Sequence, residues 1–237
     1  MKTKPSPSQV ASFKKNGALL LKQIYNETTF TKLAQSLPVS SKPGSRIFDL
    51  SGIIGDWVLR NDGLSSLANA FSGKLLRPVR VLAFNKTPQS NWAVPWHQDR
   101  VVALKQRVNN IGFENWTLKQ EIHHAEPPLE LMKEMLTLRL HLDPCDSHNG
   151  PLKVIHGSHH LGRLTDNQVR TLANEHSPTV YEVEAGDVLI LKTSIIHASD
   201  KASTPRQRRV LHVDFAPDTL RDDLAWALDI PEIETSQ

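Results

Sequence analysis

The first third of the chain carries apolar residues at helical spacing. Such residues recur every three to four positions in segments 8–15, 28–37, 53–60 and 64–72. Gly17, Pro38 and Gly73 follow three of these segments, and glycine or proline commonly ends a helix. A short apolar run at 18–23 predicts a strand between the first two helices. Residues 1–73 are therefore expected to form a mostly helical N-terminal support.

The pattern changes near residue 79, where short apolar or alternating runs predict strands. They lie at 79–84, 96–104, 136–142, 152–155, 179–183, 188–191 and 209–215. Turn sequences such as Asn149-Gly150-Pro151 separate them. Short strands at regular spacing favour a mainly β fold, a barrel or sandwich covered by the N-terminal helices. We expect a single domain over residues 1–237, with the β core at 79–216.

Residues 106–134 interrupt this regular spacing of strands. The stretch is polar, and it contains Trp116 and the pair Pro127-Pro128. It follows the segment that carries the candidate metal ligands described below. We expect an insertion here, and insertions beside a site often act as a lid or as a wall for the substrate.

Size and composition fit a globular protein that acts on small molecules. The chain has 237 residues, of which 39% are hydrophobic and 22% charged. Its net charge of +3 is spread along the sequence, so we expect no nucleic-acid partner. We also expect no membrane partner, because no apolar run has the length of a transmembrane helix. Cys145 is the only cysteine, which excludes an intrachain disulfide and favours the cytoplasm. The oligomeric state stays open.

A His-Gln-Asp triplet and one distant histidine form the candidate metal site. In a strand, His97 and Asp99 project from one face and Gln98 from the other. His197 follows an apolar run and can approach from a neighbouring strand. Two imidazoles and one carboxylate are the ligand set of non-haem Fe(II) oxygenases, and they leave room for a 2-oxo acid and dioxygen. A lone His-x-Asp is a weak signal, and the alternative is a surface histidine beside an acid.

The strand expected at 209–215 has two different faces. One face carries Arg209, Leu211, Val213 and Phe215, and the other carries Arg208, Val210, His212 and Asp214. The first is more apolar and should pack under the helices, so the second should face the interior. Arg208 is therefore the best candidate to bind the distal carboxylate of 2-oxoglutarate through paired hydrogen bonds. Arg206 and Arg209 are expected to be solvated.

Two further residues are candidates for the same cavity. Ser199 lies two positions after His197 and shares its face, so it can donate to the same carboxylate; the alternative is a plain turn serine. Arg139 points inward by the alternation of strand 136–142. It can contact the cosubstrate or the substrate, or pair with an acid.

Most of the 11 histidines are not candidate metal ligands, so other roles are expected for them. His123 and His124 lie in the polar insertion and are expected to be solvated. His141 and His212 sit on the inward faces of their strands and are expected to line the cavity without ligating a metal. Loop hydrogen bonding is the better interpretation for His148, His156, His159 and His160. Cys145 is expected to be a buried apolar filler rather than a nucleophile.

Several short motifs together resemble the phytanoyl-CoA dioxygenase family. They are Phe84-Asn85-Lys86, Trp96-His97-Gln98-Asp99, Asn149-Gly150-Pro151-Leu152, Gly157-Ser158-His159, Gly186-Asp187-Val188, His197-Ala198-Ser199 and residues 208–215. The resemblance implies a double-stranded β-helix, or jelly-roll, core. It also implies Fe(II) bound by His97, Asp99 and His197, and 2-oxoglutarate bound by Arg208 with help from Ser199.

The resemblance implies the reaction but leaves the substrate open. The expected activity is hydroxylation of a small organic substrate with dioxygen, with release of succinate and carbon dioxide. Related halogenating enzymes lack the carboxylate ligand, so Asp99 favours hydroxylation. His156 replaces a proline that is frequent in the family, Arg139 replaces an aromatic residue of some relatives, and the 106–134 insertion is long. These departures leave an acyl-CoA substrate in doubt.

Two other functions stay possible from the sequence. One is a jelly-roll metalloenzyme that does not use 2-oxoglutarate, against which Arg208 argues. The other is a non-catalytic binding or sensing module on the same fold. Degenerate modules of that kind usually lose a metal ligand, and this chain keeps all three.

Overall fold

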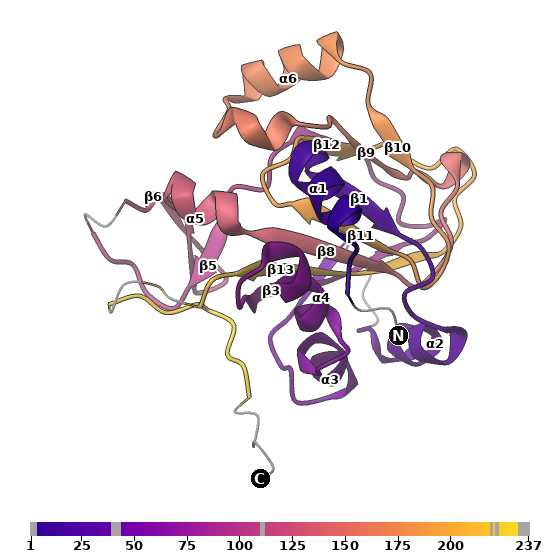
Figure 1. Ribbon diagram of the computed structural model, residues 1–237, viewed down its shortest axis with the longest axis horizontal. Coiled ribbons are helices and arrows are strands. Elements are labelled where there is room, and N and C mark those ends of the chain that lie inside the picture. The colour runs from indigo at the N-terminus through magenta and orange to yellow at the C-terminus, as the bar shows by residue number, and fades with distance from the viewer. Residues whose placement is uncertain (1–3, 39–43, 110–111, 219, 221–222, 232–237) are drawn as a thin grey trace.

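The computed structural model describes residues 4–38, 44–109, 112–218, 220 and 223–231. Its centre is a jelly roll of two antiparallel sheets (Figure 1). The major sheet has the strand order β1-β11-β8-β13-β3-β2, and the minor sheet has the order β10-β9-β12-β4. The major-sheet strands are β1 (Ala18–Leu21), β11 (Val188–Lys192), β8 (Leu136–His141), β13 (Arg208–Ala216), β3 (Arg77–Lys86) and β2 (Gly44–Ile47). The minor-sheet strands are β10 (Thr179–Tyr181), β9 (Leu152–Val154), β12 (His197–Ser199) and β4 (Val94–His97).

Helices cover the outer face of the major sheet, as the apolar pattern predicts. They are α1 (Pro7–Asn16), α2 (Glu27–Ser36), α3 (Ile53–Leu59) and α4 (Leu64–Ser72). Phe13, Leu33 and Phe71 from this layer share one buried apolar cluster with Leu211 and Phe215 of β13. A further helix, α6 (Asp166–Glu175), lies beyond the minor sheet in Figure 1. The alternation of apolar and polar residues in β8 and β13 therefore predicted correctly which face of the major sheet packs under the helices.

The opposite face of the major sheet looks toward the minor sheet and has two parts. Leu189 and Leu191 of β11 pack against Leu152 and Val154 of β9, which makes one part apolar. The other part is polar although it is buried. Its buried polar side chains are Lys86, Thr137, Arg139, His141, Arg208, His212 and Asp214. Buried polar groups are costly unless they are paired, so this part of the interior is where a functional site is expected.

The insertion is ordered into strands and a helix. Its strands β6 (Glu114–Lys119) and β7 (Ile122–Glu126) form a small sheet with β5 (Val102–Leu104), which lies just before it, and α5 (Leu129–Glu134) follows. Phe113 and Trp116 pack in an apolar cluster with Trp226, so they anchor the insertion to the body of the protein. His124 of β7 is buried, which corrects the prediction that it is solvated. Residues 110 and 111 of the insertion lie outside the described residues.

Two strands differ from the sequence prediction. The run at 96–104 is not one strand, because β4 ends at His97 and β5 begins at Val102. The short strand β2, which pairs with β3, was not predicted. It carries little apolar alternation, and an edge strand of four residues depends on its partner for stability. Among the described residues, no helix combines the length and apolar character that crossing a bilayer requires.

Candidate active site

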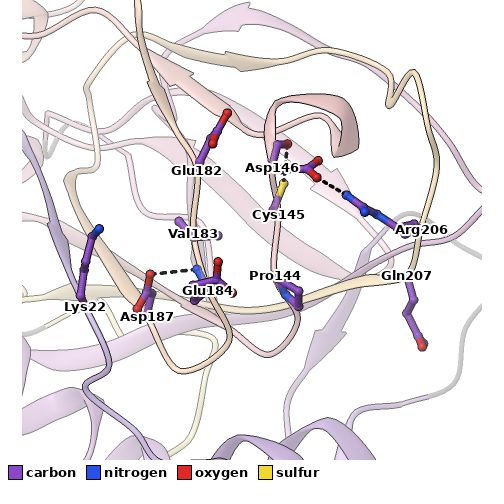
Figure 2. Close-up of a pocket in the computed structure, with 10 residues that line it drawn as sticks. All are labelled: Lys22, Pro144, Cys145, Asp146, Glu182, Val183, Glu184, Asp187, Arg206 and Gln207. Carbon is purple, nitrogen blue, oxygen red and sulfur yellow. Dashed lines mark hydrogen bonds and ion pairs between the residues drawn. The ribbon is translucent and has the colours of Figure 1, made fainter.

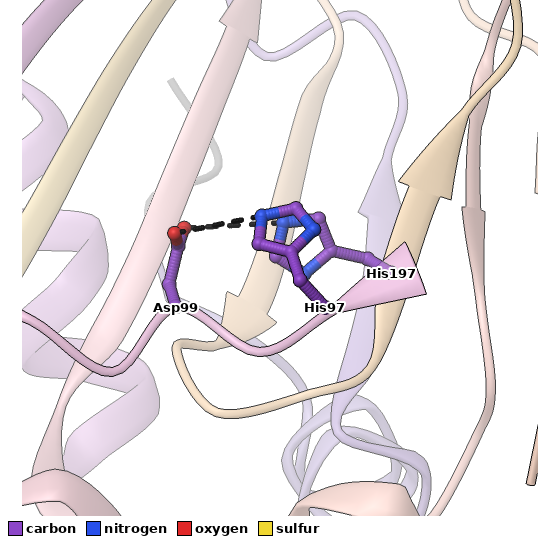
Figure 3. A group of neighbouring side chains, drawn as sticks. All are labelled: His97, Asp99 and His197. Carbon is purple, nitrogen blue, oxygen red and sulfur yellow. Dashed lines mark ion pairs between the residues drawn. The ribbon is translucent and has the colours of Figure 1, made fainter. Parts of the chain in front are cut away.

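Three side chains converge where β4 and β12 lie side by side (Figure 3). His97 ends β4 and pairs directly with His197, the first residue of β12. Asp99 follows two residues after β4. One carboxylate oxygen lies 3.7 Å from Nε2 of His97, and the other lies 3.9 Å from Nε2 of His197. Ligand atoms from all three residues lie within 4.8 Å of one another.

Hydrogen bonds to the backbone fix both imidazoles in the tautomer that a metal requires. Nδ1 of His97 lies 2.9 Å from the carbonyl oxygen of Pro95, and Nδ1 of His197 lies 2.9 Å from that of Ile195. A carbonyl only accepts, so each Nδ1 carries the proton and donates. Each Nε2 then presents its lone pair toward Asp99. Such backbone partners commonly orient metal-ligating histidines.

Gln98 holds the segment between the two ligands in place. Its amide nitrogen donates to the carbonyl oxygens of Gly162 and Ser194, and its amide oxygen accepts from the backbone N–H of Leu164. We expected Asp99 to lie on the same strand as His97, and this is wrong because β4 ends at His97. The chain leaves the sheet there, since Gln98 binds loop carbonyls across the site. The carboxylate still reaches the imidazoles, so the convergence does not depend on strand alternation.

A buried network lies behind Asp99. Arg80 of β3 forms an ion pair with Asp99 at 3.3 Å and a second, closer one with Asp214. Asp214 also accepts from Oγ1 of Thr137 at 2.7 Å and from Nε2 of His212 at 2.9 Å. The register places Arg80 directly opposite Asp214 on β13. Arg80 therefore fixes the orientation of the Asp99 carboxylate.

The electrostatics of the three side chains suit a divalent cation. Burial lowers the pKa of His197 to about 4, so this imidazole is neutral at pH 7. Burial opposes ionisation of Asp99, but Arg80 and His197 outweigh it and lower the pKa of this carboxyl. Two ligand atoms that each lie about 2.1 Å from one ion are at most about 4.2 Å apart, and the distances from Asp99 to the two imidazole nitrogens, 3.7 and 3.9 Å, fall within that limit. Two imidazoles and one carboxylate form a donor set that fits Fe(II).

These residues line a cavity of about 160 Å³ between the two sheets. All the predicted site residues reach it: His97, Asp99, His197, Arg208, Ser199 and Arg139. Leu82 and Phe84 of β3 and Trp92 supply apolar walls. This volume is below the roughly 300–1,000 Å³ of drug-sized ligand sites, so the described cavity suits small molecules.

Arg208 is a buried cation with no acidic partner among the described residues. Its Nη1 donates to the carbonyl oxygen of Gly150 and lies 3.7 Å from Sγ of Cys145. Its Nε is buried without a partner. Gly150 has a φ of +64°, and a Cβ there would lie 2.5 Å from the carbonyl oxygen of Asp200, so only glycine fits this turn. The turn thus brings a carbonyl to the guanidinium and leaves its other nitrogens for a ligand.

Lys86, noted in the sequence only as part of a family motif, is a buried cation beside the candidate cosubstrate anchor. Lys86 is 2% exposed and lies directly opposite Arg208 in the sheet. Its Nζ donates to the carbonyl oxygen of Asp200 at 2.9 Å. Burial, with the nearby Arg208, lowers the pKa of Lys86 to about 8. Alternation along β3 places Lys86 on the same face as Arg80, and this signal was available in the sequence.

Several other residues differ from their predicted surroundings. Arg209 is not free in solvent, because it forms a two-pronged ion pair with Asp143. Arg206 is exposed, as predicted, and pairs with Asp146. His141 faces the interior but does not line the cavity, and both its ring nitrogens are buried without a partner in the described structure. Burial lowers its pKa well below the usual value, so the ring is neutral.

A larger surface cavity, of about 390 Å³, lies on the far side of Cys145 (Figure 2). Its charged lining is mostly acidic: Asp146, Glu182, Glu184 and Asp187, with Lys22 and Arg206. An acidic lining repels a dicarboxylate, and no metal-ligating cluster is found there among the described residues. The smaller inner cavity is therefore the candidate active site.

Several solved structures have a fold similar to that of this chain. EctD from S. alaskensis matches with a TM-score of 0.68 and 18% identity, over 90% of this chain and 77% of that one. AviO1 from Streptomyces viridochromogenes Tue57 matches with a TM-score of 0.64 and 20% identity, over 92% and 97% of the two chains. SnoK, a non-haem carbocyclase from nogalamycin biosynthesis that depends on α-ketoglutarate, matches with a TM-score of 0.66 and 14% identity, over 90% and 84%. No curated protein matches the chain in sequence.

At these identities the solved structures establish the fold. EctD has also been crystallised with bound iron, and with 2-oxoglutarate and 5-hydroxyectoine. The family model described as phytanoyl-CoA dioxygenase (PhyH) matches residues 58–210, which is more than half of the chain. That range contains His97, Asp99 and His197. With its jelly-roll fold and its His-Asp-His cluster, the chain belongs to the phytanoyl-CoA dioxygenase (PhyH) family of non-haem iron, 2-oxoglutarate-dependent dioxygenases.

Proposed function

We propose that the protein hydroxylates a small organic substrate, with Fe(II) and 2-oxoglutarate in the cavity between its two sheets. The observation that carries this proposal is the pairing of two features in one cavity. One is the cluster of His97, Asp99 and His197, and the other is the buried guanidinium of Arg208, which pairs with no acid among the described residues. A metalloenzyme that does not use 2-oxoglutarate has no need for the second feature.

The two imidazoles and the Asp99 carboxylate hold the iron. When bound, iron and 2-oxoglutarate together supply the oxidising power that splits dioxygen, yielding succinate, carbon dioxide and a hydroxylated product. The chain keeps His97 and His197 in the ligating tautomer through the carbonyls of Pro95 and Ile195. Arg80 holds Asp99 ionised and oriented.

Arg208 binds the distal carboxylate of 2-oxoglutarate. A buried guanidinium without an anion is costly, so a dianion that enters here gains a strong charge-assisted contact. Ser199 is buried on β12 at the same cavity and donates to that carboxylate, and Lys86 adds a second positive charge. Arg139 donates from Nη1 to Nδ1 of His212 at 3.0 Å and keeps an unpartnered Nε. We assign Arg139 to the cosubstrate as well.

The cavity that holds the candidate metal cluster also has apolar walls. Leu82, Phe84 and Leu152 supply them, and they suit the organic part of a substrate. Asp99 occupies the position that halogenating relatives leave free, so we propose hydroxylation.

Succinate formation tests the proposal directly. Purified protein is supplied with Fe(II), and oxygen consumption is followed with and without 2-oxoglutarate while succinate is measured. We expect both to require 2-oxoglutarate, and Arg208→Gln to raise its KM about 100-fold, which corresponds to about 2.7 kcal/mol. Arg206→Gln, an exposed arginine two positions earlier, is the matched control. Oxygen consumption that proceeds equally without 2-oxoglutarate would support the other class of jelly-roll metalloenzyme.

A further inference from the structure

Arg46 stands at the edge of the major sheet, on the face that looks into the interior. It belongs to β2 and lies directly opposite Leu82 of β3, whose side chain lines the metal cavity. Directly opposed residues of an antiparallel pair project from the same face. A small depression at this edge is lined by Arg46, Phe48 and Arg80 together. Arg46 is thus beside the guanidinium that holds Asp99.

The charges of Arg80 and Asp214 both act on Arg46, but Arg46 forms no ion pair of its own with a described carboxylate. Its Nη1 donates to Nε2 of His124 at 3.1 Å. Nδ1 of His124 donates to the carbonyl oxygen of Ile122 at 2.9 Å, so Nε2 is an acceptor and the ring is neutral. No described carboxylate lies within ion-pair distance of Arg46. Arg80, by contrast, is neutralised by Asp99 and Asp214.

The surroundings of Arg46 combine this positive charge with an accessible aromatic ring. The guanidinium carbon lies 5.6 Å from the centre of the Phe48 ring, and Phe48 is 45% exposed. His124 comes from the insertion, so two segments outside the core strands of the jelly roll build this edge together. An exposed aromatic side chain beside an unpaired cation suits an anion with an apolar body.

The cosubstrate does not account for Arg46. On β3, Lys86 pairs with Arg208 and Leu82 pairs with Arg46, so these two residues give the positions of the two arginines along the sheet. Lys86 and Leu82 are four residues apart, which corresponds to about 13 Å along the strand. The distal carboxylate of 2-oxoglutarate is assigned to Arg208, and its other end to the metal. A positive group at the opposite edge is left for another molecule.

We infer that Arg46, held in place by His124, binds an anionic group of the organic substrate, a carboxylate or a phosphate monoester. The inference rests on the proposed function, because it assumes that a substrate enters beside the metal cluster. His124 acts as a positioning residue, and Arg46 makes the contact. Binding an anion there also balances the positive charge that the edge of the site retains.

A panel of compounds, in which each anion is paired with a neutral analogue, tests the inference. Small carboxylates are paired with their primary amides, such as phenylacetate with phenylacetamide and hexanoate with hexanamide, and phosphate monoesters are paired with their parent alcohols. Each compound is added to Fe(II)-loaded protein with saturating 2-oxoglutarate, and succinate release is measured. Binding is measured independently as the change in melting temperature of the Ni(II)-loaded protein with 2-oxoglutarate. The comparison uses wild type, Arg46→Gln, Arg46→Lys, His124→Gln and the control Arg60→Gln, an exposed arginine at the C-terminal end of α3.

We expect the anionic member of at least one pair to stimulate succinate release and raise the melting temperature, and its neutral partner to do neither. Arg46→Gln should raise the KM of that anion at least tenfold with a smaller change in kcat, and Arg46→Lys should recover part of the loss. His124→Gln should give an intermediate KM, and Arg60→Gln none of these effects. The relative response of carboxylates and phosphate monoesters identifies the anion.

Four results would overturn the inference. Three of them are a panel in which no anion binds, neutral partners that work as well as the anions, and an Arg46→Gln variant with unchanged KM. Loss of 2-oxoglutarate affinity in Arg46→Gln would also contradict it, because the residue would then serve the cosubstrate. A different result is expected if the proposed function itself is wrong. Wild type would then form no succinate from 2-oxoglutarate, either alone or with any compound of the panel.

Discussion

The two ends of the polar interior differ in how their charges are balanced. At the metal end, Asp99 pairs with Arg80, and Arg80 pairs with Asp214. At the other end, Arg208 and Lys86 lie opposite each other, and neither has a carboxylate within ion-pair distance among the described residues. Strand β3 supplies Arg80 to one end and Lys86 to the other, and β13 supplies Asp214 and Arg208 in the same way. The difference therefore lies in which side chains these strands carry at each end, and not in the fold.

This contrast indicates which part of the site is complete in the protein alone. The metal end is assembled by its own ion pairs and hydrogen bonds before a ligand arrives. The cosubstrate end carries buried positive charge that only an added anion can balance, and burial disfavours such charge. Changes at the two ends should therefore have opposite effects on the stability of the ligand-free protein, and different effects on the affinities for metal and cosubstrate.

The largest effect is expected from Asp99→Ala. Loss of an outer partner of a metal ligand costs about 10–100-fold in affinity or activity, and loss of the ligand itself should cost more. We expect iron content after Fe(II) loading and succinate formation to fall by more than 100-fold. The exposed Asp62→Ala serves as the control. Undiminished succinate formation in Asp99→Ala would exclude this residue as a ligand.

Asp214→Asn should destabilise the protein by about 3 kcal/mol, because it leaves Arg80 and His212 short of a buried anion. Arg208→Met should be neutral or stabilising, because it removes a buried charge that pairs with no carboxylate in the described part of the chain. Urea denaturation of the ligand-free proteins gives both free energies of unfolding. Equal destabilisation by the two substitutions would contradict the contrast between the two ends.

The same carboxyl predicts how stability depends on pH. Burial opposes ionisation of Asp214, but Arg80, His212 and Thr137 outweigh it and lower its pKa. A lowered pKa in the folded state stabilises the protein above the unfolded-state value, about 3.9, and this contribution is lost as the pH falls further. Wild type should thus lose stability below about pH 4 more steeply than Asp214→Asn.

Arg80→Gln should weaken iron binding by about 10–100-fold, since Arg80 orients a metal-ligating carboxylate from outside the ligand set. The dissociation constant for Fe(II), measured anaerobically, reports the change. The exposed Arg170→Gln on α6 is the control. An unchanged dissociation constant would mean that Asp99 is oriented by the backbone and not by the ion pair.

Lys86 gives the smallest effect, about tenfold or less. Its amine loses its proton near pH 8, so the KM for 2-oxoglutarate should rise between pH 7 and 9 as the positive charge is lost. Lys86→Arg should flatten this rise, because a guanidinium stays charged. A pH profile of KM that is identical in both proteins would remove Lys86 from the cosubstrate site.

The alternation of inward and outward residues within single strands accounts for the parts of the fold that were predicted correctly. It placed Arg139 on the inward face of β8, and Arg208 and His212 on that of β13, because strand side chains alternate with a period of two. The triplet and the distant histidine predicted that two imidazoles and one carboxylate come together, and the structure places His97, Asp99 and His197 side by side.

Long-range pairing accounts for what was missed. The match of Arg80 with Asp214 depends on the register between β3 and β13, which the sequence does not show. The strand β2 forms only because β3 is available to pair with it, and the buried position of His124 depends on its hairpin. The end of β4 at His97 follows from hydrogen bonds of Gln98 to distant loops.

The central claim is that one ion, held by His97, Asp99 and His197, shares its cavity with a 2-oxoglutarate anchored by Arg208. Anaerobic titration of Fe(II)-loaded protein with 2-oxoglutarate tests it most directly, through the visible charge-transfer absorption that appears when a 2-oxo acid chelates ferrous iron. We predict that the band forms in wild type, requires about 100-fold more 2-oxoglutarate in Arg208→Gln, and is absent in Asp99→Ala. A wild-type protein that binds Fe(II) but shows no band, or a band that Arg208→Gln leaves unchanged, would contradict the account.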